Sequence, residues 1–350
     1  MRPAIVLATT IAVAAVAGTA ISLAQRPPAP RHPTIAASPD VSAIPPTNQP
    51  AVAFGFSVAP DLQRHQLVLF GGVGDFSNTW LWDGAAWSRA QPAMSPPGRY
   101  GASAAFDPQI GAVLLFGGIL QTGQTANDTW AWDGRTWQEV DTGRDGPGGG
   151  AASAMAWDPS RSEMVLVAPS PGGGGGGGQT WTWSGTRWVH DRAGVLGTRD
   201  TGILMAFDPV SNALIAEGCC ASPTVGTLGG VPSTWRWDGS AWSVLATSVR
   251  PPDGSSLGLD PSLRRLVLCG CDLAGGLAPR MWVWDGRDWM PGPYPRLPLA
   301  PEAEVVDPAD SQFLVLGAAI GGVDALTQTV QVWAIRGTAW LRLGTGLHSG

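Results

Sequence analysis

Short apolar runs separated by turn residues recur along most of the chain. In each unit an apolar, small-residue segment such as 101–106 leads into Asp-Pro, and a second apolar run such as 67–72 follows. After a loop of variable length comes Thr-Trp-x-Trp, where the period of two puts both indoles on one face of a strand. Asp-Gly then favours a tight hairpin before a final Trp. The pattern predicts four strands per unit.

Tryptophan marks the repeat most clearly. The first five Trp-x-Trp pairs begin 50, 51, 54 and 47 residues apart, and a third Trp follows each pair by five residues. The sixth unit is degenerate, and we align Trp333 with the second Trp of the pair, which puts Ala334 at the Asp position. Recurrence in every unit favours a structural core over a sugar-stacking surface. The core set is Trp80, Trp82, Trp87, Trp130, Trp132, Trp137, Trp181, Trp183, Trp188, Trp235, Trp237, Trp242, Trp282, Trp284, Trp289, Trp333 and Trp340.

A second mark, Asp next to Pro, repeats in the same register. Pro fixes φ and Asp can accept hydrogen bonds from the following backbone, so each dipeptide predicts a turn between the first two strands. The first unit has the reversed order, Pro60-Asp61. The other five are Asp107-Pro108, Asp158-Pro159, Asp208-Pro209, Asp260-Pro261 and Asp307-Pro308.

One such four-stranded sheet cannot bury both of its faces, so we expect the six sheets to stack radially. The sequence therefore predicts an all-β protein, a six-bladed β-propeller over residues 51–344. Each unit begins with its first strand and ends with its fourth, so the sixth blade should close on the first by packing.

The blades resemble kelch repeats, of the type found in galactose oxidase-like propellers, here in an exported bacterial protein. The kelch pattern is a strand ending in Gly-Gly, then aromatic-x-aromatic-Asp, then Trp. Residues 69–72 with 80–83 match it, as do residues 115–118 with 130–133. Later units replace Gly-Gly, for example by Gly270-Cys271, which affects loop geometry more than architecture.

The N-terminal residues predict export. Arg2 precedes an uncharged, mostly apolar run of 21 residues, 4–24, which is long for a signal peptide and just long enough to cross a bilayer. Residues 1–25 are therefore a cleaved signal peptide or a membrane anchor, and both place the remainder outside the cytoplasm, secreted or tethered. Residues 26–50 read as a Pro-rich disordered stalk and 345–350 as a tail.

Composition narrows the partners. The chain carries 21 basic and 27 acidic residues, a net charge of −6, and so lacks the basic face that nucleic acid requires. All basic residues are Arg, which with 48 Gly and 31 Pro indicates a high-GC genome. We expect membrane contact only through an uncleaved N-terminal segment.

The four cysteines are Cys219, Cys220, Cys269 and Cys271, on adjacent units. Clustered cysteines in an exported protein favour disulfides. We favour two bridges that join the 219/220 pair to the 269/271 pair. A vicinal Cys219–Cys220 bridge and a four-thiolate zinc site are the alternatives, and the spacing does not decide the connectivity.

Catalytic groups are scarce. The copper chemistry of galactose oxidase-like enzymes needs Tyr and His ligands, yet the chain has two Tyr and four His, and only His65 and His190 fall in the repeats away from the termini. The run 172–178 is all Gly but lacks the Lys-Ser/Thr of a phosphate loop. No Gly-x-Ser-x-Gly is present. The recurring Asp83, Asp133, Asp238 and Asp285 fit Asp-Gly turns. We expect no catalytic residue, cofactor or metal.

The loops between second and third strands and between blades vary in length, whereas the Asp turns are uniform. Function tends to reside in variable loops on a rigid scaffold. We therefore expect a non-catalytic extracytoplasmic propeller that binds a protein or glycan through its variable-loop face. The alternatives are a carbohydrate-active enzyme with carboxylates on that face and a structural component of the cell envelope. The candidate ligand-binding residues are Asp75, Arg99, Asp128, Arg199, Asp200 and Asp272.

Overall fold

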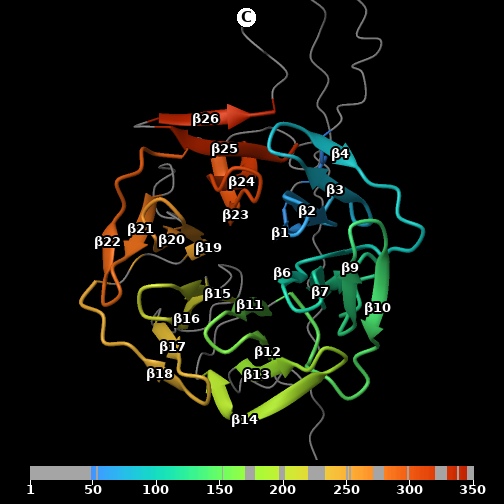
Figure 1. Cartoon of the computed structure of the whole chain (residues 1–350), viewed down its shortest axis with the longest axis horizontal. Helices are drawn as coiled ribbons and strands as arrows, with labels where there is room; N and C mark the ends of the chain where they lie inside the picture. The colour runs from blue at the N-terminus through green and yellow to red at the C-terminus, as the bar shows by residue number, and fades with distance from the viewer. Residues whose placement is uncertain are drawn as a thin grey trace, which may run out of the picture. The chain divides into compact units, whose positions relative to one another are not determined.

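The computed structural model describes residues 49–344 except 53, 152, 170–177, 197–201, 220–232, 250, 252–253, 271–279, 298, 320–328 and 337–338. All of them belong to the compact unit Thr47–Gly350. Six four-stranded blades stand in a ring around a central channel (Figure 1), with a single parallel pair, Cys219 with Gly254, linking blades 4 and 5, and the described chain contains no helix. The predicted all-β, six-bladed propeller is confirmed.

Each blade is one contiguous segment of four antiparallel strands in chain order from the inside outward. Blade 1 is β1 (Ser57–Asp61), β2 (Gln66–Phe70), β3 (Thr79–Trp82) and β4 (Trp87–Arg89). Blade 2 is β6 (Ser103–Asp107), β7 (Ala112–Phe116), β9 (Thr129–Trp132) and β10 (Trp137–Asp141). Blade 3 is β11 (Ala154–Asp158), β12 (Glu163–Pro169), β13 (Gly178–Trp183) and β14 (Trp188–Leu196).

The second half of the ring repeats this plan. Blade 4 is β15 (Gly202–Asp208), β16 (Ala213–Cys219), β17 (Thr234–Trp237) and β18 (Trp242–Val244). Blade 5 is β19 (Gly254–Asp260), β20 (Arg265–Gly270), β21 (Arg280–Trp284) and β22 (Trp289–Pro291). Blade 6 is β23 (Leu299–Val306), β24 (Phe313–Ala319), β25 (Gln331–Arg336) and β26 (Ala339–Leu343). A further two-stranded sheet pairs β5 (Arg99–Tyr100) with β8 (Ile119–Leu120).

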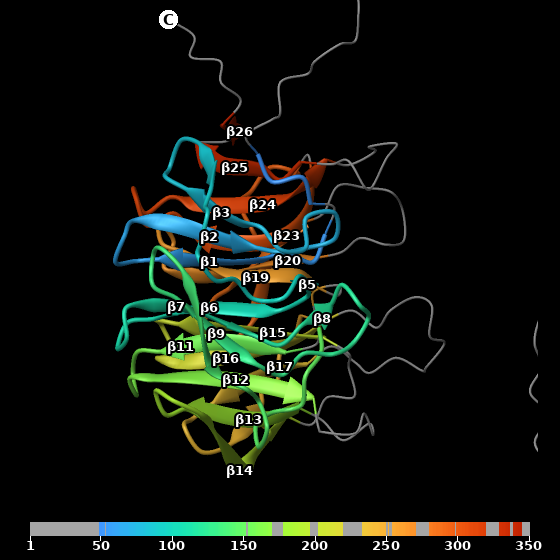
Figure 2. The same ribbon diagram turned by 90° about the vertical axis from the view of Figure 1, so that its right-hand side faces the viewer.

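The turn between the first two strands is built around a buried Asp in every blade. A carboxylate oxygen accepts a backbone N–H two or three residues later, as in Gln109 N to Asp107 Oδ1 at 2.8 Å. The fourth residue after each Asp has a positive φ between 50° and 62°: His65, Gly111, Ser162, Asn212, Arg264 and Ser311. The Asp turns therefore share one conformation, and they lie on the side of the disc opposite β5 and β8 (Figure 2).

The Asp-Gly turns differ in detail from the expected hairpin. Asp83 N donates to Ala86 O, so Gly84 is the first of two central residues rather than the second, with φ +96°. The Asp83 carboxylate accepts the N–H groups of Ala85 and Ala86 and lies at the surface. The same arrangement recurs at Asp133, Asp238 and Asp285.

Tryptophans fill the interfaces between blades. Thirteen of the seventeen repeat Trp are buried, and Trp235, Trp282, Trp333 and Trp340 are partly buried. At four successive interfaces the fourth-strand indole donates to the Thr that precedes the first Trp of the third strand in the preceding blade. These bonds are Trp137–Thr79, Trp188–Thr129, Trp242–Thr180 and Trp289–Thr234, with Nε1–Oγ1 distances of 2.8 to 2.9 Å.

Blade 6 breaks this pattern, and our alignment of its Trp residues was wrong by two positions. Ile335 pairs with Trp340 as Trp82 pairs with Trp87, so Trp333 occupies the first Trp position and Arg336 the Asp position. The Thr position is Met281 in blade 5 and Val332 in blade 6. Neither side chain carries a hydroxyl, and Trp340 Nε1 donates instead to Pro295 O at 2.9 Å.

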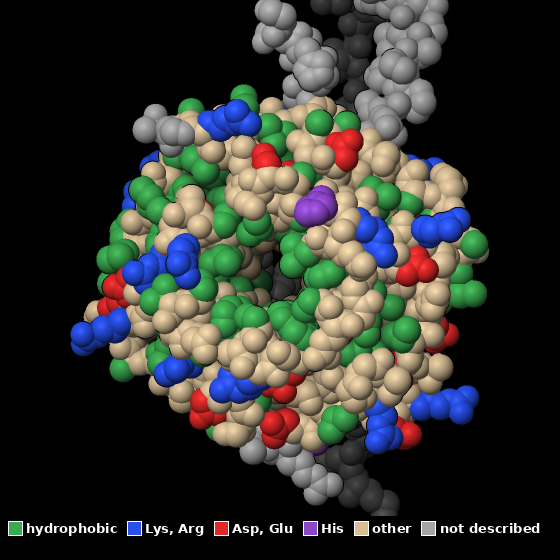
Figure 3. Space-filling model, in the orientation of Figure 1, with side chains coloured by type: hydrophobic (Ala, Val, Ile, Leu, Met, Phe, Trp, Pro, Cys, Tyr) green, Lys and Arg blue, Asp and Glu red, His purple; other side chains and the backbone are tan. Residues whose placement is uncertain are grey.

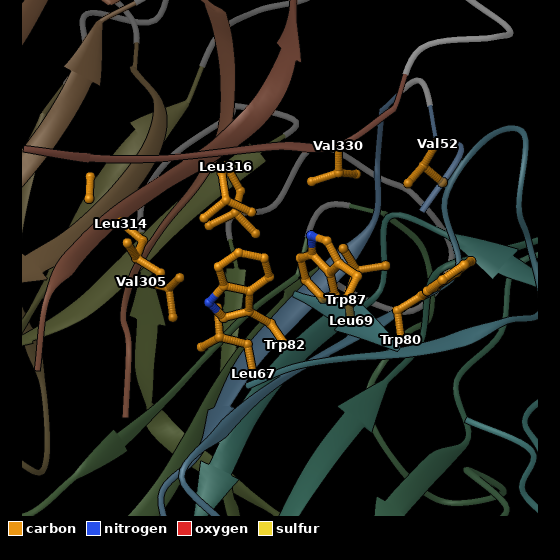
Figure 4. Packing of buried hydrophobic residues seen from close by; sticks show 12 residues of the cluster. Val52, Leu67, Leu69, Trp80, Trp82, Trp87, Val305, Leu314, Leu316 and Val330 are labelled. Atoms are coloured by element: carbon orange, nitrogen blue, oxygen red, sulfur yellow. The ribbon is translucent and has the colours of Figure 1, made fainter. Parts of the chain in front are cut away.

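The ring closes by packing between blades 6 and 1. Trp82 and Trp87 lie with Leu67 and Leu69 toward Leu314 and Leu316 of blade 6 (Figure 4). Hydrogen bonds add to this packing: Trp82 Nε1 donates to Asp307 Oδ2 at 3.2 Å. In the segment before β1, Pro50 O accepts Val330 N and Gln49 Nε2 donates to Gly344 O, both at 3.0 Å. Closure therefore needs no strand shared between the two ends.

Candidate functional site

The inner strands enclose a cavity of about 460 Å³ within the channel. This volume falls in the range of about 300–1,000 Å³ that is typical of small-molecule sites. Small and apolar side chains from all six blades line most of it. Apolar side chains also surround the mouth of the channel on the face that carries the Asp turns, which is the face seen in Figure 3. Any polar group on this wall is therefore conspicuous.

A β-bulge places Glu302 on the cavity wall. Pro301 pairs with Gly317 and Ala303 with Leu316, so Glu302 is an extra residue in β23. Bulges re-aim side chains and are enriched near functional sites. Glu302 Oε2 accepts Gly55 N at 3.3 Å, and burial raises the pKa of Glu302 above its usual value while that hydrogen bond opposes the rise. β19 of blade 5 has a similar register shift between Gly254 and Ser256.

Glu304 lies between the inner strands of blades 5 and 6. A Cβ at Gly258 of β19 would come within 2.6 Å of Glu304 Cβ, so the glycine makes room for this side chain. Glu304 is 8% exposed, and neither carboxylate oxygen meets a described donor in hydrogen-bond geometry. Burial raises the pKa of Glu304 to about 8, an effect that the nearby Ser256 hydroxyl opposes.

Aromatic side chains adjoin this end of the wall. Phe56 lines the cavity next to Gly55 in sequence, and Phe54 is 48% exposed. The Tyr100 ring lies against Gly55, within 3.4 Å of where a Cβ would be, and Gly101 N donates to Gly55 O at 2.7 Å. We call Phe56, Ser256, Glu302 and Glu304 the channel site. Glu302 and Glu304 lie on β23, five and three residues before the turn residue Asp307.

The channel site is acidic. Glu302 and Glu304 are the titratable side chains among the residues that line the cavity, and no Arg or His is among those residues. Two further groups bear on Glu304: Ser256, and Tyr294, whose hydroxyl donates to Asp260 at 2.6 Å. Neither supplies a positive charge, so Glu302 lies on this wall without a cationic partner among the described lining residues.

The structure brings together two of the predicted ligand-binding residues. Arg99 is fully buried and forms a bidentate pair with Asp128, with N–O distances of 2.6 and 2.9 Å. Arg99 also donates to Pro97 O and Gly117 O, and Asp128 accepts Trp130 Nε1. These hydrogen bonds stabilise the loops that contain the two residues. The Arg99 guanidinium holds the pKa of Asp128 below its usual value despite burial.

Asp75 is likewise engaged within the protein, because it accepts Trp80 Nε1 at 2.8 Å and also contacts Asn78. The remaining three candidates, Arg199, Asp200 and Asp272, lie outside the described residues. A ligand-binding role for the set stays a prediction.

Several other predictions also fall outside the described part of the chain. Cys220, Cys271 and the side chain of Cys219 are not described, whereas Cys269 is buried beside Met281 and Val283 in blade 5. The apolar run 4–24 and the stalk are not described either. Between residues 49 and 344, as far as they are described, no helix has the length and apolarity to cross a membrane. No group of three or more His, Cys, Asp or Glu residues there could hold a metal ion.

Sequence reasoning missed Glu302 and Glu304, although a signal was present. Counting back from the turn Asp, the position of Glu304 holds Val58, Ala104, Met155, Met205 and Leu257 in the other blades. A carboxylate at an otherwise apolar repeat position is therefore unique to the sixth unit. Comparison of units position by position would have identified it.

The sequence matches no protein-family model and no curated protein. Solved structures do resemble the fold. The structure of YjhT has a TM-score of 0.56 with 14% identity, covering 85% of this chain and 99% of that chain. The Aleuria aurantia lectin, as a mutant bound to Fucα1-6GlcNAc, has a TM-score of 0.55 with 16% identity, covering 87% of this chain and all of that one. The same mutant with α-methyl-L-fucoside has a TM-score of 0.54, 16% identity, and coverage of 87% and 99%. At these identities the likeness establishes a shared propeller fold.

Proposed function

We propose that this protein is a non-catalytic propeller that binds glycans at the channel site, from the variable-loop face. One observation carries the proposal: the partly exposed Glu302, with the buried Glu304 two residues further along β23, lies with Phe56 on the wall of a cavity of about 460 Å³ whose other lining side chains are apolar or small. Carboxylates accept hydrogen bonds from hydroxyls, and aromatic faces contact the apolar faces of sugar rings. The fold likeness to a fucose-binding lectin complex supports the same conclusion.

A glycan suits this cavity better than a protein surface, because a recess of this volume holds a small ligand or the end of an oligosaccharide. The kelch-like units and the apolar run 4–24 support an exported, kelch-type protein that meets its ligand outside the cytoplasm. These attributes remain part of the proposal.

The test is a glycan array probed with the full chain, followed by calorimetric titration of the ligands retained. Glu302→Gln keeps an acceptor for Gly55 N–H but removes the charge, so we expect binding to weaken about tenfold or more, the scale of a charged hydrogen bond. Glu139→Gln, at an exposed position of β10, is the matched control and should bind as the wild type does. Absence of any glycan ligand, or equal binding by Glu302→Gln, would contradict the proposal.

The raised pKa of Glu304 favours one alternative, a carbohydrate-active enzyme, because a carboxyl protonated at neutral pH can act as a general acid. Release of reducing ends from a bound oligosaccharide, lost in Glu304→Gln but not in Glu139→Gln, would establish that alternative. Binding without turnover would favour the lectin-like function.

A further inference from the structure

The charge of the channel site indicates which glycans it accepts. Glu302 and Glu304 belong to the cavity lining, the described lining residues include no basic side chain, and the polar groups that bear on Glu304, namely Ser256 and Tyr294, are neutral. Glycans that bear carboxylate, sulfate or phosphate would place like charge beside the Glu302 carboxylate at low effective dielectric. The site therefore selects against anionic ligands.

A neutral sugar would leave the Glu302 carboxylate without a charged partner. A ligand ammonium group would instead donate charge-assisted hydrogen bonds to Glu302, which are shorter and roughly twice as strong as neutral ones. Glu302 is the accessible acceptor, because the bulge brings it onto the wall and its side chain is partly exposed. Glu304 lies two residues further along β23, and its carboxylate is buried without a described donor.

We propose that the ligand of the channel site is an amino sugar with a free amine, held by Glu302, with Glu304 as the second acidic group beside it. This inference rests on the proposed glycan-binding function and specifies its ligand class. The amine would lie at the level of the β23 bulge, and the sugar ring would lie toward Phe56.

Calorimetry with a matched pair of probes tests this inference: the β1,4-linked glucosamine disaccharide and its di-N-acetylated form, both at pH 7 with the full chain. Acetylation removes the charge and changes little else in the ring. We expect the free amine to bind about tenfold more tightly or better. Glu302→Gln should abolish that preference, and Glu139→Gln should retain it. Propylamine serves as a third probe, because it carries the amine without a sugar.

The outcomes separate the two proposals. Equal binding of both disaccharides by the wild type, or a preference that persists in Glu302→Gln, would overturn the amino-sugar assignment while leaving glycan binding intact. Propylamine binding that is lost in Glu302→Gln, with no carbohydrate bound at all, would support the amine site and overturn the glycan function. Binding of none of the three probes, together with array binding of neutral or acidic glycans, would overturn the amine assignment.

Discussion

Among the described carboxyl groups, Glu304 is distinguished by two buried oxygens that both lack a hydrogen-bond donor in the described structure. The turn residues Asp107 and Asp307 are also buried with raised pKa values, but backbone N–H groups oppose the rise. At Glu304 the Ser256 hydroxyl alone opposes burial, and the pKa reaches about 8. A proton is therefore held at neutral pH where an exposed glutamate would have lost it.

This proton makes stability depend on pH. Because the pKa of Glu304 is raised to about 8 in the folded protein, its contribution is fully present below about 4.5 and is lost as the pH rises toward 8. The slope attributable to one such group approaches roughly 1.4 kcal/mol per pH unit. We predict that Glu304→Gln flattens this part of the profile and is more stable than the wild type at pH 9. Urea unfolding at pH 5 and pH 9 measures the effect, and parallel profiles for the two proteins would refute it.

Charged loop residues show the limits of sequence reasoning at this scale. Arg99 and Asp128 were selected as candidates for ligand contact, and the structure pairs them across 29 residues of sequence. That pairing depends on how the loops of two strands meet, which no local pattern encodes. Glu302 and Glu304 lie within strand β23, whereas all of the candidates predicted from the sequence were assigned to the variable-loop face.

Between elements, the recurring Thr–Trp hydrogen bond ties one blade to the next. Trp188 of blade 3 donates to Thr129 of blade 2 at 2.9 Å, and both residues are buried. Removing the hydroxyl leaves a buried indole N–H without an acceptor, which costs about 1–3 kcal/mol.

We therefore predict that Thr129→Val, which preserves the shape of the side chain, lowers the free energy of unfolding by that amount. The half-buried Thr182 of β13 provides the comparison, and Thr182→Val should change stability by less than about 0.5 kcal/mol. Denaturant unfolding of both variants measures the two changes in the free energy of unfolding. Equal losses would mean that the Thr129 hydroxyl has no special role.

The strands themselves were predictable, because turn residues and Trp recur in register and each turn is stabilised locally. The predicted alignment failed in blade 6, where the second Trp of the Trp-x-Trp pair is missing. In blade 6, Trp333 without its partner was aligned to the wrong position, since either alignment places an aromatic ring in the strand. The register of Ile335 with Trp340 became visible only through pairing across the hairpin.

For the whole ring, blade 6 lacks the recurring Thr–Trp hydrogen bond on both of its sides. Four interfaces carry the Thr–Trp bond, whereas Met281 and Val332 remove its acceptor at the two interfaces that flank blade 6. Glu304 adds a buried carboxyl at one of these two interfaces. Local opening follows the weakest set of contacts.

We predict that amides of β23 to β26 exchange with deuterium before those of β11 to β14, measured by mass spectrometry of peptic fragments at neutral pH. The difference should widen at pH 9, after correction for intrinsic exchange rates, because ionised Glu304 weakens the interface between blades 5 and 6. Uniform protection around the ring would show instead that the blades open together.

The contact between Gln49 and Gly344 has a topological consequence. Because each blade is made from one uninterrupted stretch and the seam between blades 6 and 1 is held by side-chain packing and hydrogen bonds, the two ends of the described chain lie side by side without being interwoven. Joining those ends and cutting the polypeptide between any two other blades would preserve every strand pair. The folded ring therefore does not determine which blade comes first along the chain.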